Sequence, residues 1–463
     1  MHSPFDSSTV EQQIEAVAMG REYAPRRRVT VQDLLGTPVA EMAIAPPVYI
    51  HSTISSMREA PTFSLAEIHS AMARAADSFQ HDSIAGLSPD AYCQRVRRTT
   101  GLPMAVMQNA LAVIAQALRD MPQIIDAGRP KGACWSRYDA QALAGCSLFS
   151  RKGDVFAVLA AGNGPGIHAL WPQALALGYR VLVRPSTREP FTAQRVVCAM
   201  VKAGLAHYVA LIPTDYRGAD ELVASADLTL AYGGQDIVDK YRFHPQVRVQ
   251  GPGRAKIVVG ADACLDEAAA LVAKSMTDLG GAACVSASAV LVEGDTHDFG
   301  RRLRLALQQL PLETLPLVSR QSVDWLSSVL DSPIEADPTP EGYVLYPLVT
   351  EVTEPDDPRV QRELPFPCVT VAPYQAIRSA PMLSGSLVVT VFSRQPQLLE
   401  PILSDASISN VYIGDIPTTW MAPSVPHDAY LSDFLMCNRG FRVAPSWSEN
   451  KSKGEILCPP LMR

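Results

Sequence analysis

The chain has 463 residues, of which 47% are hydrophobic and 19% are charged, and its formal net charge is −7. This composition excludes a disordered or fibrous chain, and the length is sufficient for two or three domains with buried cores. Because Lys and Arg are not in excess, nucleic acid and anionic membranes are poor partners, and we expect a small-molecule ligand.

Cysteine usage and the N-terminus indicate the compartment. The nine cysteines are an odd number and include no Cys-x-x-Cys pair, which argues against a disulfide framework or a zinc site, so we expect no metal. The N-terminal residues include Asp6, Glu11 and Glu15 and lack the apolar segment of a secretory signal. No run approaches the roughly 20 apolar residues of a membrane span. We therefore expect a cytoplasmic protein without a membrane span.

The first part of the chain changes from irregular to helical. Residues 1–60 mix prolines with short apolar pieces and are expected to form an irregular lead-in with one or two strands. Ser64 followed by Glu67 has the form of a capping box and predicts a helix over 65–79. Two further helices are predicted over 89–99 and 103–120. The periodicity weakens over 136–150, where a hairpin or linker is expected.

A regular alternation of strands and helices begins near residue 154. The run 154–161 is almost continuously apolar, which is typical of a strand buried on both faces of a parallel sheet. After the turn 162–166 we predict a helix ending at 177, strands at 180–183, 208–212 and 228–232, and helices at 191–203, 219–224 and 235–242. This pattern predicts a doubly wound α/β sheet with its ligand at the carboxyl ends of the strands.

The alternation continues less regularly over 251–439, where a second α/β domain is predicted. Its expected strands cover 257–259, 289–292, 345–349, 368–371 and 387–392, and its expected helices cover 265–277, 299–309 and 322–330. The last segment, 440–463, is polar and proline-rich, and we expect a tail or a subunit contact.

One cysteine stands out because of its neighbours. Gly280 and Gly281 precede Cys284, and an apolar strand-like run follows it. Glycine permits backbone angles that other residues avoid, so this turn is able to hold the thiol against a ligand. The alternative is a small buried cysteine in a Gly/Ala-rich turn.

Five short motifs occur in an order that resembles the aldehyde dehydrogenase superfamily across about residues 100 to 437. They are Asn163, Arg184-Pro185-Ser186, Gly233-Gly234, Cys284 and the segment from Glu363 to Pro367. The resemblance implies an α/β fold with two doubly wound domains. These would be a Rossmann-type dinucleotide-binding domain (61–135 and 154–250) and a catalytic cysteine domain (251–439), with an oligomerisation hairpin and tail (136–153 and 440–463). It also implies a homodimer or homotetramer.

The resemblance assigns roles to these residues. Cys284 would be the nucleophile, and Asn163 would hold the oxyanion, although an asparagine in a turn is often only structural. The cofactor-binding residues would be Arg184, Pro185, Ser186, Thr187, Gly233, Gly234, Gln250, Glu363 and Phe366. In this chemistry a thiolate attacks an aldehyde, hydride passes to the nicotinamide and a thioester remains on the enzyme; reduction of a thioester is the reverse path.

Two departures from the family pattern narrow the expected reaction. Gln250 stands where hydrolytic members carry the glutamate that activates water, and the following Gly-Pro-Gly resembles the acylating, coenzyme A-dependent branch. Arg184 replaces the usual lysine, and Thr187 stands where NAD-preferring relatives often carry glutamate. Both changes favour NADP(H), with NAD(H) as the alternative, although Arg184 is also suited to capping a strand end.

The remaining candidates have structural alternatives. We interpret His427-Asp428 as a structural turn, because no hydroxyl nucleophile is located beside it. Aromatic residues suited to a substrate tunnel are equally suited to the core; they are Trp171, Tyr232, Phe366, Trp420 and Phe434.

The expected function is interconversion of an acyl thioester and an aldehyde by an NAD(P)-dependent enzyme. The acyl group would arrive on coenzyme A or an acyl carrier protein. The alternatives are oxidation of an aldehyde to its acid, and a pseudoenzyme that binds a nucleotide or a protein partner.

Overall fold

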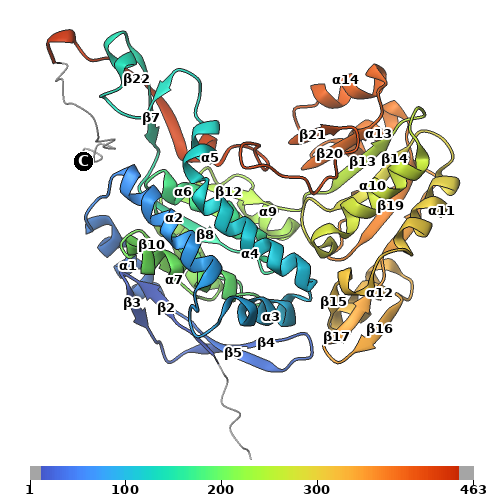
Figure 1. The fold of residues 1–463 in the computed structure, drawn as a ribbon, viewed down its shortest axis with the longest axis horizontal. Coiled ribbons are helices and arrows are strands. Elements are labelled where there is room, and N and C mark those ends of the chain that lie inside the picture. The colour runs from blue at the N-terminus through green and yellow to red at the C-terminus, as the bar shows by residue number, and fades with distance from the viewer. Residues whose placement is uncertain (1–11, 448–463) are drawn as a thin grey trace, which may run out of the picture.

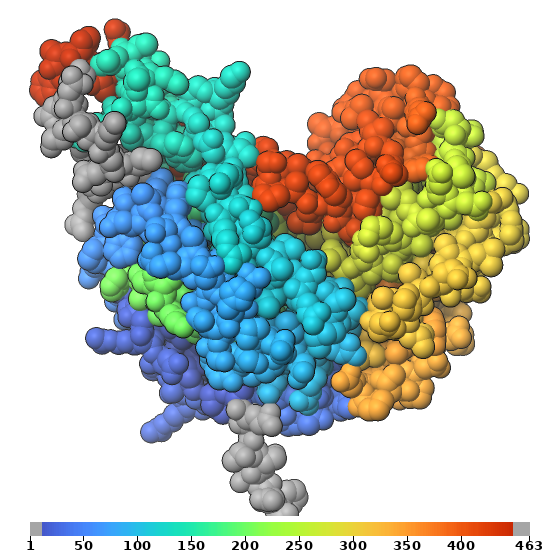
Figure 2. Space-filling view, in the orientation of Figure 1, coloured from blue at the N-terminus to red at the C-terminus, as the bar shows by residue number. Residues whose placement is uncertain are grey.

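The computed structural model describes residues 12–447, which form two lobes and a projecting arm (Figure 1). Each lobe is built around one large sheet, seven-stranded in the first lobe and six-stranded in the second. A notch separates the lobes on the face shown in Figure 2, and the orange-red C-terminal segment lies at its floor. No helix within the described residues has the length and apolar character needed to cross a bilayer.

The sheet of the first lobe has the order β12-β11-β8-β9-β10-β2-β3. Its first five strands are parallel, and β2 pairs antiparallel with both β10 and β3. The strands are β2 (Ala16–Ala18), β3 (Arg21–Tyr23), β8 (Val155–Leu159), β9 (Arg180–Arg184), β10 (Val209–Leu211), β11 (Leu228–Tyr232) and β12 (Val247–Gln250). A smaller sheet combines β1 (Gln13–Ile14), β5 (Pro38–Ala43) and β4 (Arg28–Gln32).

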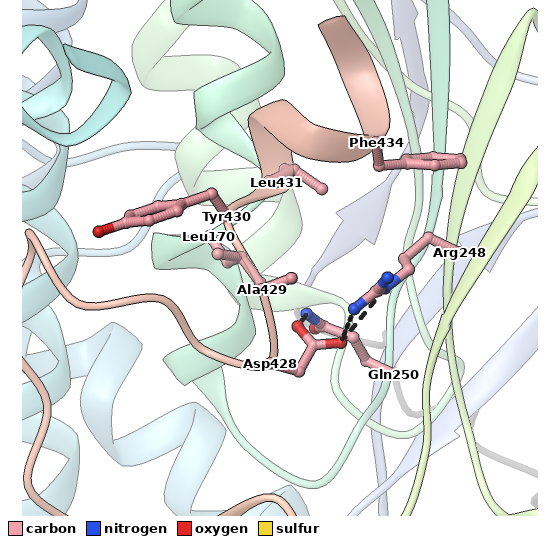
Figure 3. Close-up of a pocket in the computed structure, with 8 residues that line it drawn as sticks. All are labelled: Leu170, Arg248, Gln250, Asp428, Ala429, Tyr430, Leu431 and Phe434. Carbon is pink, nitrogen blue, oxygen red and sulfur yellow. Dashed lines mark hydrogen bonds and ion pairs between the residues drawn. The ribbon is translucent and has the colours of Figure 1, made fainter. Parts of the chain in front are cut away.

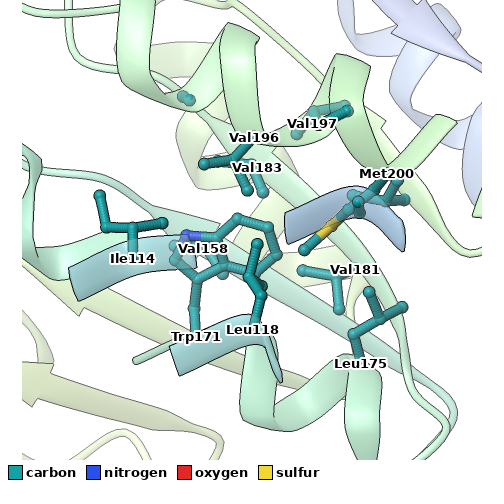
Figure 4. Packing of buried hydrophobic residues seen from close by; sticks show 14 of the residues in the cluster. Ile114, Leu118, Val158, Trp171, Leu175, Val181, Val183, Val196, Val197 and Met200 are labelled. Carbon is teal, nitrogen blue, oxygen red and sulfur yellow. The ribbon is translucent and has the colours of Figure 1, made fainter. Parts of the chain in front are cut away.

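Helices cover both faces of this sheet. They are α1 (Pro47–Glu59), α2 (Leu65–His81), α3 (Pro89–Thr100), α4 (Met104–Arg119), α5 (Met121–Ala127), α6 (Pro172–Ala176), α7 (Phe191–Met200), α8 (Tyr216–Ser225) and α9 (Gln235–Tyr241). Alternate residues of β8 enter opposite cores, Phe156 and Val158 on one face and Val155 and Ala157 on the other. The first core surrounds the fully buried Trp171 (Figure 4). The predicted strand buried on both faces is therefore confirmed.

The second lobe has the all-parallel order β18-β19-β14-β13-β20-β21. Its strands are β13 (Ala255–Val259), β14 (Ala287–Val292), β18 (Leu348–Glu351), β19 (Cys368–Pro373), β20 (Val388–Phe392) and β21 (Asn410–Ile413), and its helices are α10 (Leu265–Thr277), α11 (Thr296–Leu307), α12 (Arg320–Leu330), α13 (Ala376–Leu383) and α14 (Pro396–Ser404). A small sheet of β15 (Leu317–Val318), β17 (Gly342–Leu345) and β16 (Ala336–Thr339) faces the first lobe.

The arm is a three-stranded sheet formed by distant segments. The central strand β7 (Cys146–Arg151) pairs antiparallel with β22 (Met436–Phe441) and parallel with β6 (Ala133–Cys134). Residues 136–153 therefore do not form a hairpin of their own, because their main partner comes from the other end of the chain, after α15 (Leu431–Leu435). Most of the expected tail, 448–463, lies outside the described residues.

Two predictions about elements are wrong. Residues 13–59 are more regular than expected, with five strands and helix α1, which begins at Pro47, a residue suited to the first turn of a helix. The strand predicted over 345–349 is two strands in different sheets, β17 and β18. Pro347 stands between them, and because proline has no N–H, it is suited to such a break.

Candidate active site

The parallel strands of the first lobe reverse the direction of their connections at β8. From β8 the chain moves outward through β9 and β10, and it then returns to the other side of β8 to form β11 and β12. Connections that leave neighbouring strands in opposite directions open a ligand-binding crevice in doubly wound sheets. The sequence motifs at Asn163, Arg184, Gly233 and Gln250 all lie at or just after these carboxyl ends, so they converge on one edge of the sheet.

Cys284 lies in the second lobe, in the turn before β14. Leu279, Gly280 and Gly281 have consecutive positive φ angles of 60°, 68° and 66°. Glycine adopts such angles freely, whereas Leu279 is held there by its surroundings. A Cβ on Gly281 would lie 2.4 Å from the nitrogen of Pro367, so the turn is fixed against that segment. The Cys284 side chain itself is only partly buried.

Both lobes contact the Cys284 turn. A Cβ on Gly253 would lie 2.0 Å from the Cys284 carbonyl oxygen, so the interlobe crossing at 251–254 passes directly against the cysteine backbone. From the first lobe, Asn163 donates from Nδ2 to the Ala282 carbonyl oxygen at 3.0 Å. The two residues expected to be catalytic, Cys284 and Asn163, are therefore brought to one place across the lobes.

The residues expected beside the nicotinamide differ in their placement. Glu363 Oε2 accepts the backbone N–H of Arg254 at 2.6 Å, next to Gly253. Burial raises the pKa of Glu363, although the backbone donors of Arg254 and Gly253 oppose this shift. Phe366 is 1% exposed and packs with side chains of α12 and β17. Its ring belongs to the core of the second lobe, and its expected contact with the cofactor stays a prediction.

The turn expected to bind the adenosine ribose follows β9. Pro185 is buried and Thr187 is exposed. Ser186 Oγ accepts the backbone N–H of Arg188 at 3.2 Å, and a Cβ on Gly162 would lie 2.3 Å from that same oxygen. The turns after β8 and β9 are therefore in direct contact, which leaves little room for a side chain at position 162.

Arg184 presents its charge at the end of the same strand. Its Nε donates to the Thr214 carbonyl oxygen at 3.2 Å, and its guanidinium carbon lies 5.8 Å from the centre of the exposed Tyr216 ring. Burial lowers the pKa of Arg184, and Tyr216 and Asp215 oppose this shift. The carboxylate of Asp215 is itself paired with Arg27 at 2.6 Å. Arg184 thus makes one strand-end hydrogen bond and leaves other donors for a ligand.

Gly233 and Gly234 connect β11 to α9. The Gly233 N–H donates to the Gln250 carbonyl oxygen at 3.2 Å, and a Cβ on Gly233 would lie 2.4 Å from a side-chain carbon of Ile237. This turn is therefore packed tightly under α9, beside the start of the interlobe crossing.

Sequence reasoning missed one residue at the site. His427 Nε2 lies 3.5 Å from Cys284 Sγ, and its Nδ1 lies 3.5 Å from Asp428 Oδ1. The interpretation of His427-Asp428 as only a structural turn did not foresee this contact with the Cys284 thiol. That interpretation considered a hydroxyl partner, whereas the partner is the thiol that the same sequence had already singled out.

Asp428 is held by two side chains of β12. Arg248 donates to Oδ2 from Nη2 at 2.7 Å and from Nε at 3.2 Å, and Gln250 donates from Nε2 to Oδ1 at 3.0 Å. These residues line a small pocket beneath α15 (Figure 3). Burial would raise the pKa of Asp428, but His427 and Arg248 outweigh it and hold that pKa well below its usual range. Gln250 thus faces this carboxylate, and its expected contact with the cofactor stays a prediction.

The aromatic candidates separate into core and site residues. Trp171 is fully buried (Figure 4) and, like Phe366, belongs to the core. Tyr232 is partly buried, with its hydroxyl 3.4 Å from the Ile167 carbonyl oxygen. Phe434 lines the pocket of Figure 3, and Trp420 is 42% exposed.

Comparison with known proteins gives a consistent result. The aldehyde dehydrogenase family model matches residues 153–427. Malonate-semialdehyde dehydrogenase 1 from Geobacillus kaustophilus (strain HTA426) is 26% identical over 239 residues, which cover 45% of this chain and 49% of the relative. Long-chain acyl-protein thioester reductase from Vibrio harveyi is 27% identical over 155 residues, 31% of this chain and 32% of the relative. The matches thus span at most about half the length of these relatives.

Solved structures share the fold over nearly the whole chain. The aldehyde dehydrogenase KauB from Pseudomonas aeruginosa has a TM-score of 0.78 at 17% identity, covering 92% of this chain and 96% of that one. Indole-3-acetaldehyde dehydrogenase, solved with NAD+, has a TM-score of 0.76 at 16% identity, covering 93% and 97%. The α/β fold is that of aldehyde dehydrogenases, and with a family model that matches more than half of its length, the chain belongs to the aldehyde dehydrogenase family.

Proposed function

We propose that this chain interconverts an acyl thioester and an aldehyde through a covalent thioester on Cys284, with a nicotinamide dinucleotide as cofactor. The observation that carries the proposal is a partly exposed sulfur, fixed on a tight turn beside a side-chain amide from the other lobe. A thiolate attacks carbonyl carbon readily, and an amide donor stabilises the oxyanion that forms. Asn163 is suited to exchange its bond to Ala282 for that oxyanion.

The amide side chain at position 250 favours a thiol, and not water, as the acceptor of the acyl group. Gln250 donates to Asp428, and an amide is unable to remove a proton from water at neutral pH. The name of the Vibrio harveyi relative, a long-chain acyl-protein thioester reductase, is consistent with this direction. The proposed substrate is therefore an acyl group on coenzyme A or on a carrier protein.

The carboxyl ends of β8, β9 and β11 are the proposed dinucleotide site, with NADP(H) preferred to NAD(H). Arg184 presents a guanidinium beside the exposed Tyr216 ring, and Thr187 brings no carboxylate. A guanidinium binds phosphate through its charge and paired hydrogen bonds. When bound, the nicotinamide supplies or accepts the hydride of the reaction.

The direct test is product analysis with octanoyl coenzyme A and NADPH. We expect octanal, free coenzyme A and NADP+ in equal amounts. Cys284→Ser should abolish turnover but keep NADPH affinity, measured by quenching of protein fluorescence. Undiminished turnover in that variant would remove the nucleophile assignment.

A test of cofactor choice uses Arg184→Leu. If Arg184 holds the 2′-phosphate, the Kd for NADPH should rise about 10-fold or more, because a charged hydrogen bond is lost, while the Kd for NADH changes little. Arg58→Leu is the matched control, since Arg58 lies on α1 and pairs with Asp227 at 2.8 Å. Equal losses for both dinucleotides would contradict the NADP(H) preference.

Oxidation of an aldehyde to its acid is the second candidate, and His427 favours it, because the imidazole beside the sulfur, once it has given up a proton, is able to activate water. Octanal and NADP+ with and without coenzyme A separate the two functions. Octanoic acid formed at full rate without any thiol would favour the second.

A further inference from the structure

The imidazole of His427 is fixed in place at the sulfur. It belongs to the segment that returns from the second lobe to the arm, and its backbone carbonyl accepts a hydrogen bond from Asn410 Nδ2. Asn410 is 8% exposed, lies on β21 and also donates to the Leu387 carbonyl oxygen at 3.1 Å. Because a buried side chain of the sheet holds this carbonyl, the main chain at His427 is anchored to the core of the second lobe.

The far side of the ring faces an organised carboxylate. Asp428 Oδ1 lies 3.5 Å from His427 Nδ1, and the same carboxylate accepts hydrogen bonds from Arg248 and Gln250 (Figure 3). A carboxylate at Nδ1 favours a proton on that nitrogen and positive charge on the ring. A glutamate at position 250 would instead set a second carboxylate against Asp428. The amide at 250 is therefore matched to the carboxylate at 428.

Two groups that contact His427, Cys284 and Asp428, favour its charged form. Arg248 is a cation and does not favour that charge, but it pairs with Asp428 Oδ2. Burial of His427 itself opposes the charge, but its contacts with Asp428 and Cys284 outweigh burial and raise its pKa to about 10. The ring is thus protonated at neutral pH and faces the sulfur with a donor.

We propose that His427 is the acid–base residue of acyl transfer at Cys284, with Asp428 and Gln250 as positioning residues, and that the substrate is an acyl thioester with a weakly acidic leaving thiol. This inference rests on the proposed function for its acyl substrate. It adds a cofactor-free activity, exchange of an acyl group between thiols.

The proton balance is complete within these residues. The Cys284 thiolate attacks the acyl carbon, a new C–S bond forms, and the bond to the leaving sulfur breaks with its electron pair. Nε2 of the His427 imidazolium gives its proton to that sulfur, so a neutral thiol leaves and the imidazole becomes neutral. In reverse, neutral His427 takes the proton of an incoming thiol, which attacks the acyl-cysteine. No electrons are transferred in either direction.

The test compares leaving groups in the absence of dinucleotide. Acyl-enzyme formation is followed by rapid-quench mass spectrometry with the octanoyl thioester of N-acetylcysteamine and with phenyl thiooctanoate, whose leaving thiol is more acidic. Loss of a general acid typically slows a reaction about 10²- to 10⁴-fold. We expect that loss in His427→Gln for the alkyl thioester and a much smaller loss for the aryl thioester, which leaves without protonation. Equal losses, or none, would overturn the proposal.

Two further measurements guard against a merely structural effect. His297→Gln is the matched control, since His297 is an exposed histidine of α11, and its rates should equal those of the wild type for both thioesters. If His427→Gln does not fold, Asp428→Asn and Gln250→Glu replace it. Both should show the same leaving-group dependence to a smaller degree, and the absence of that dependence in both would equally overturn the proposal.

The two proposals fail separately. If octanoyl coenzyme A acylates Cys284 with His427-dependent kinetics but NADPH yields no octanal, the reductase function is wrong and the acid–base assignment stands. If octanal forms and His427→Gln retains the wild-type leaving-group dependence, only the assignment of His427 is wrong.

Discussion

The Asn163 amide connects the two lobes at the point where chemistry is proposed. Its Nδ2 donates to a neutral carbonyl, that of Ala282, at 3.0 Å, and its side chain is exposed. Hydrogen bonds to an oxyanion are about twice as strong as those to a neutral carbonyl. Exchange of Ala282 for a developing oxyanion is therefore favourable in the transition state, and it requires only a small movement of one amide.

Asn163→Ala should lower kcat/KM for acyl-thioester reduction by about 10²- to 10³-fold, because one oxyanion donor is removed. The Kd for NADPH should remain that of the wild type. Steady-state kinetics and fluorescence quenching measure the two quantities. Asn438→Ala is the control, since Asn438 lies on β22 and contacts Ser147. A variant that keeps its kcat/KM would exclude Asn163 as an oxyanion donor.

Residues at the site were predictable where the chain carries a local motif. Asn163 and Cys284 were identified from short turns, and the structure brings both turns together. His427 was not identified, because its contact with Cys284 joins residues 143 positions apart and depends on the return path of the chain. Phe366 was singled out by its motif alone, and its ring is buried, so its contact with the cofactor stays a prediction.

A fully buried carboxylic acid, Glu189, lies just before helix α7. Glu189 is 0% exposed, Oε1 accepts the Thr192 backbone N–H at 2.8 Å, and within the described residues Oε2 has no hydrogen-bond partner. Burial raises its pKa from 4.5 to about 7, although hydrogen bonds from Thr192 and Phe191 oppose the shift. Between these two values the folded chain binds more protons than the unfolded chain, so this group lowers stability as the pH rises through that window.

Glu189→Gln keeps the helix-capping acceptor and removes the titration. The variant should match the wild type near pH 4.5 and exceed it above pH 7, by at most about 3 kcal/mol, since one pKa unit corresponds to about 1.4 kcal/mol. Urea unfolding at pH 5 and pH 8.5 measures the difference. Glu267→Gln, at an exposed position in the first turn of α10, should show little change with pH. A stability difference for Glu189→Gln that does not vary with pH would contradict the burial argument.

Elements with strong local signals were predicted well. Helix α2 begins at the predicted capping box of Ser64 and Glu67, and β11 has the predicted bounds. Helices α13 and α14 were missed, and each contains an internal proline, Pro381 and Pro401, which locally disfavours a helix. Strands β12 and β21 are four residues each, too short to stand out, and they are defined by pairing with β11 and β20. Tertiary contacts therefore determine the secondary structure of segments whose local sequence pattern is ambiguous.

At the scale of the whole molecule, the site depends on how the lobes meet. Asn163 comes from one lobe and Cys284 from the other, so a change in lobe position separates them. Away from the site, the small sheet of the second lobe docks on the first lobe next to α3 (Figure 1). There the Leu317 N–H donates to the Gly101 carbonyl oxygen at 2.8 Å, and Arg97 pairs with Glu341 at 2.8 Å.

Gly101→Ala should therefore reduce catalysis as well as stability, although it lies outside the site. Its Cβ would lie 1.8 Å from the Leu317 carbonyl oxygen, which forces the small sheet away from α3. Gly86→Ala is the matched control, because Gly86 has nearly the same φ, 79° against 80°, but no atom within 4 Å of a new Cβ. Backbone strain of about 1–2 kcal/mol is common to both variants.

We expect a further loss of unfolding free energy and a lower kcat only in Gly101→Ala, measured by urea unfolding and steady-state kinetics. If the two variants lose equal stability and keep the same kcat, the lobe contact at Leu317 does not position Asn163 against Cys284.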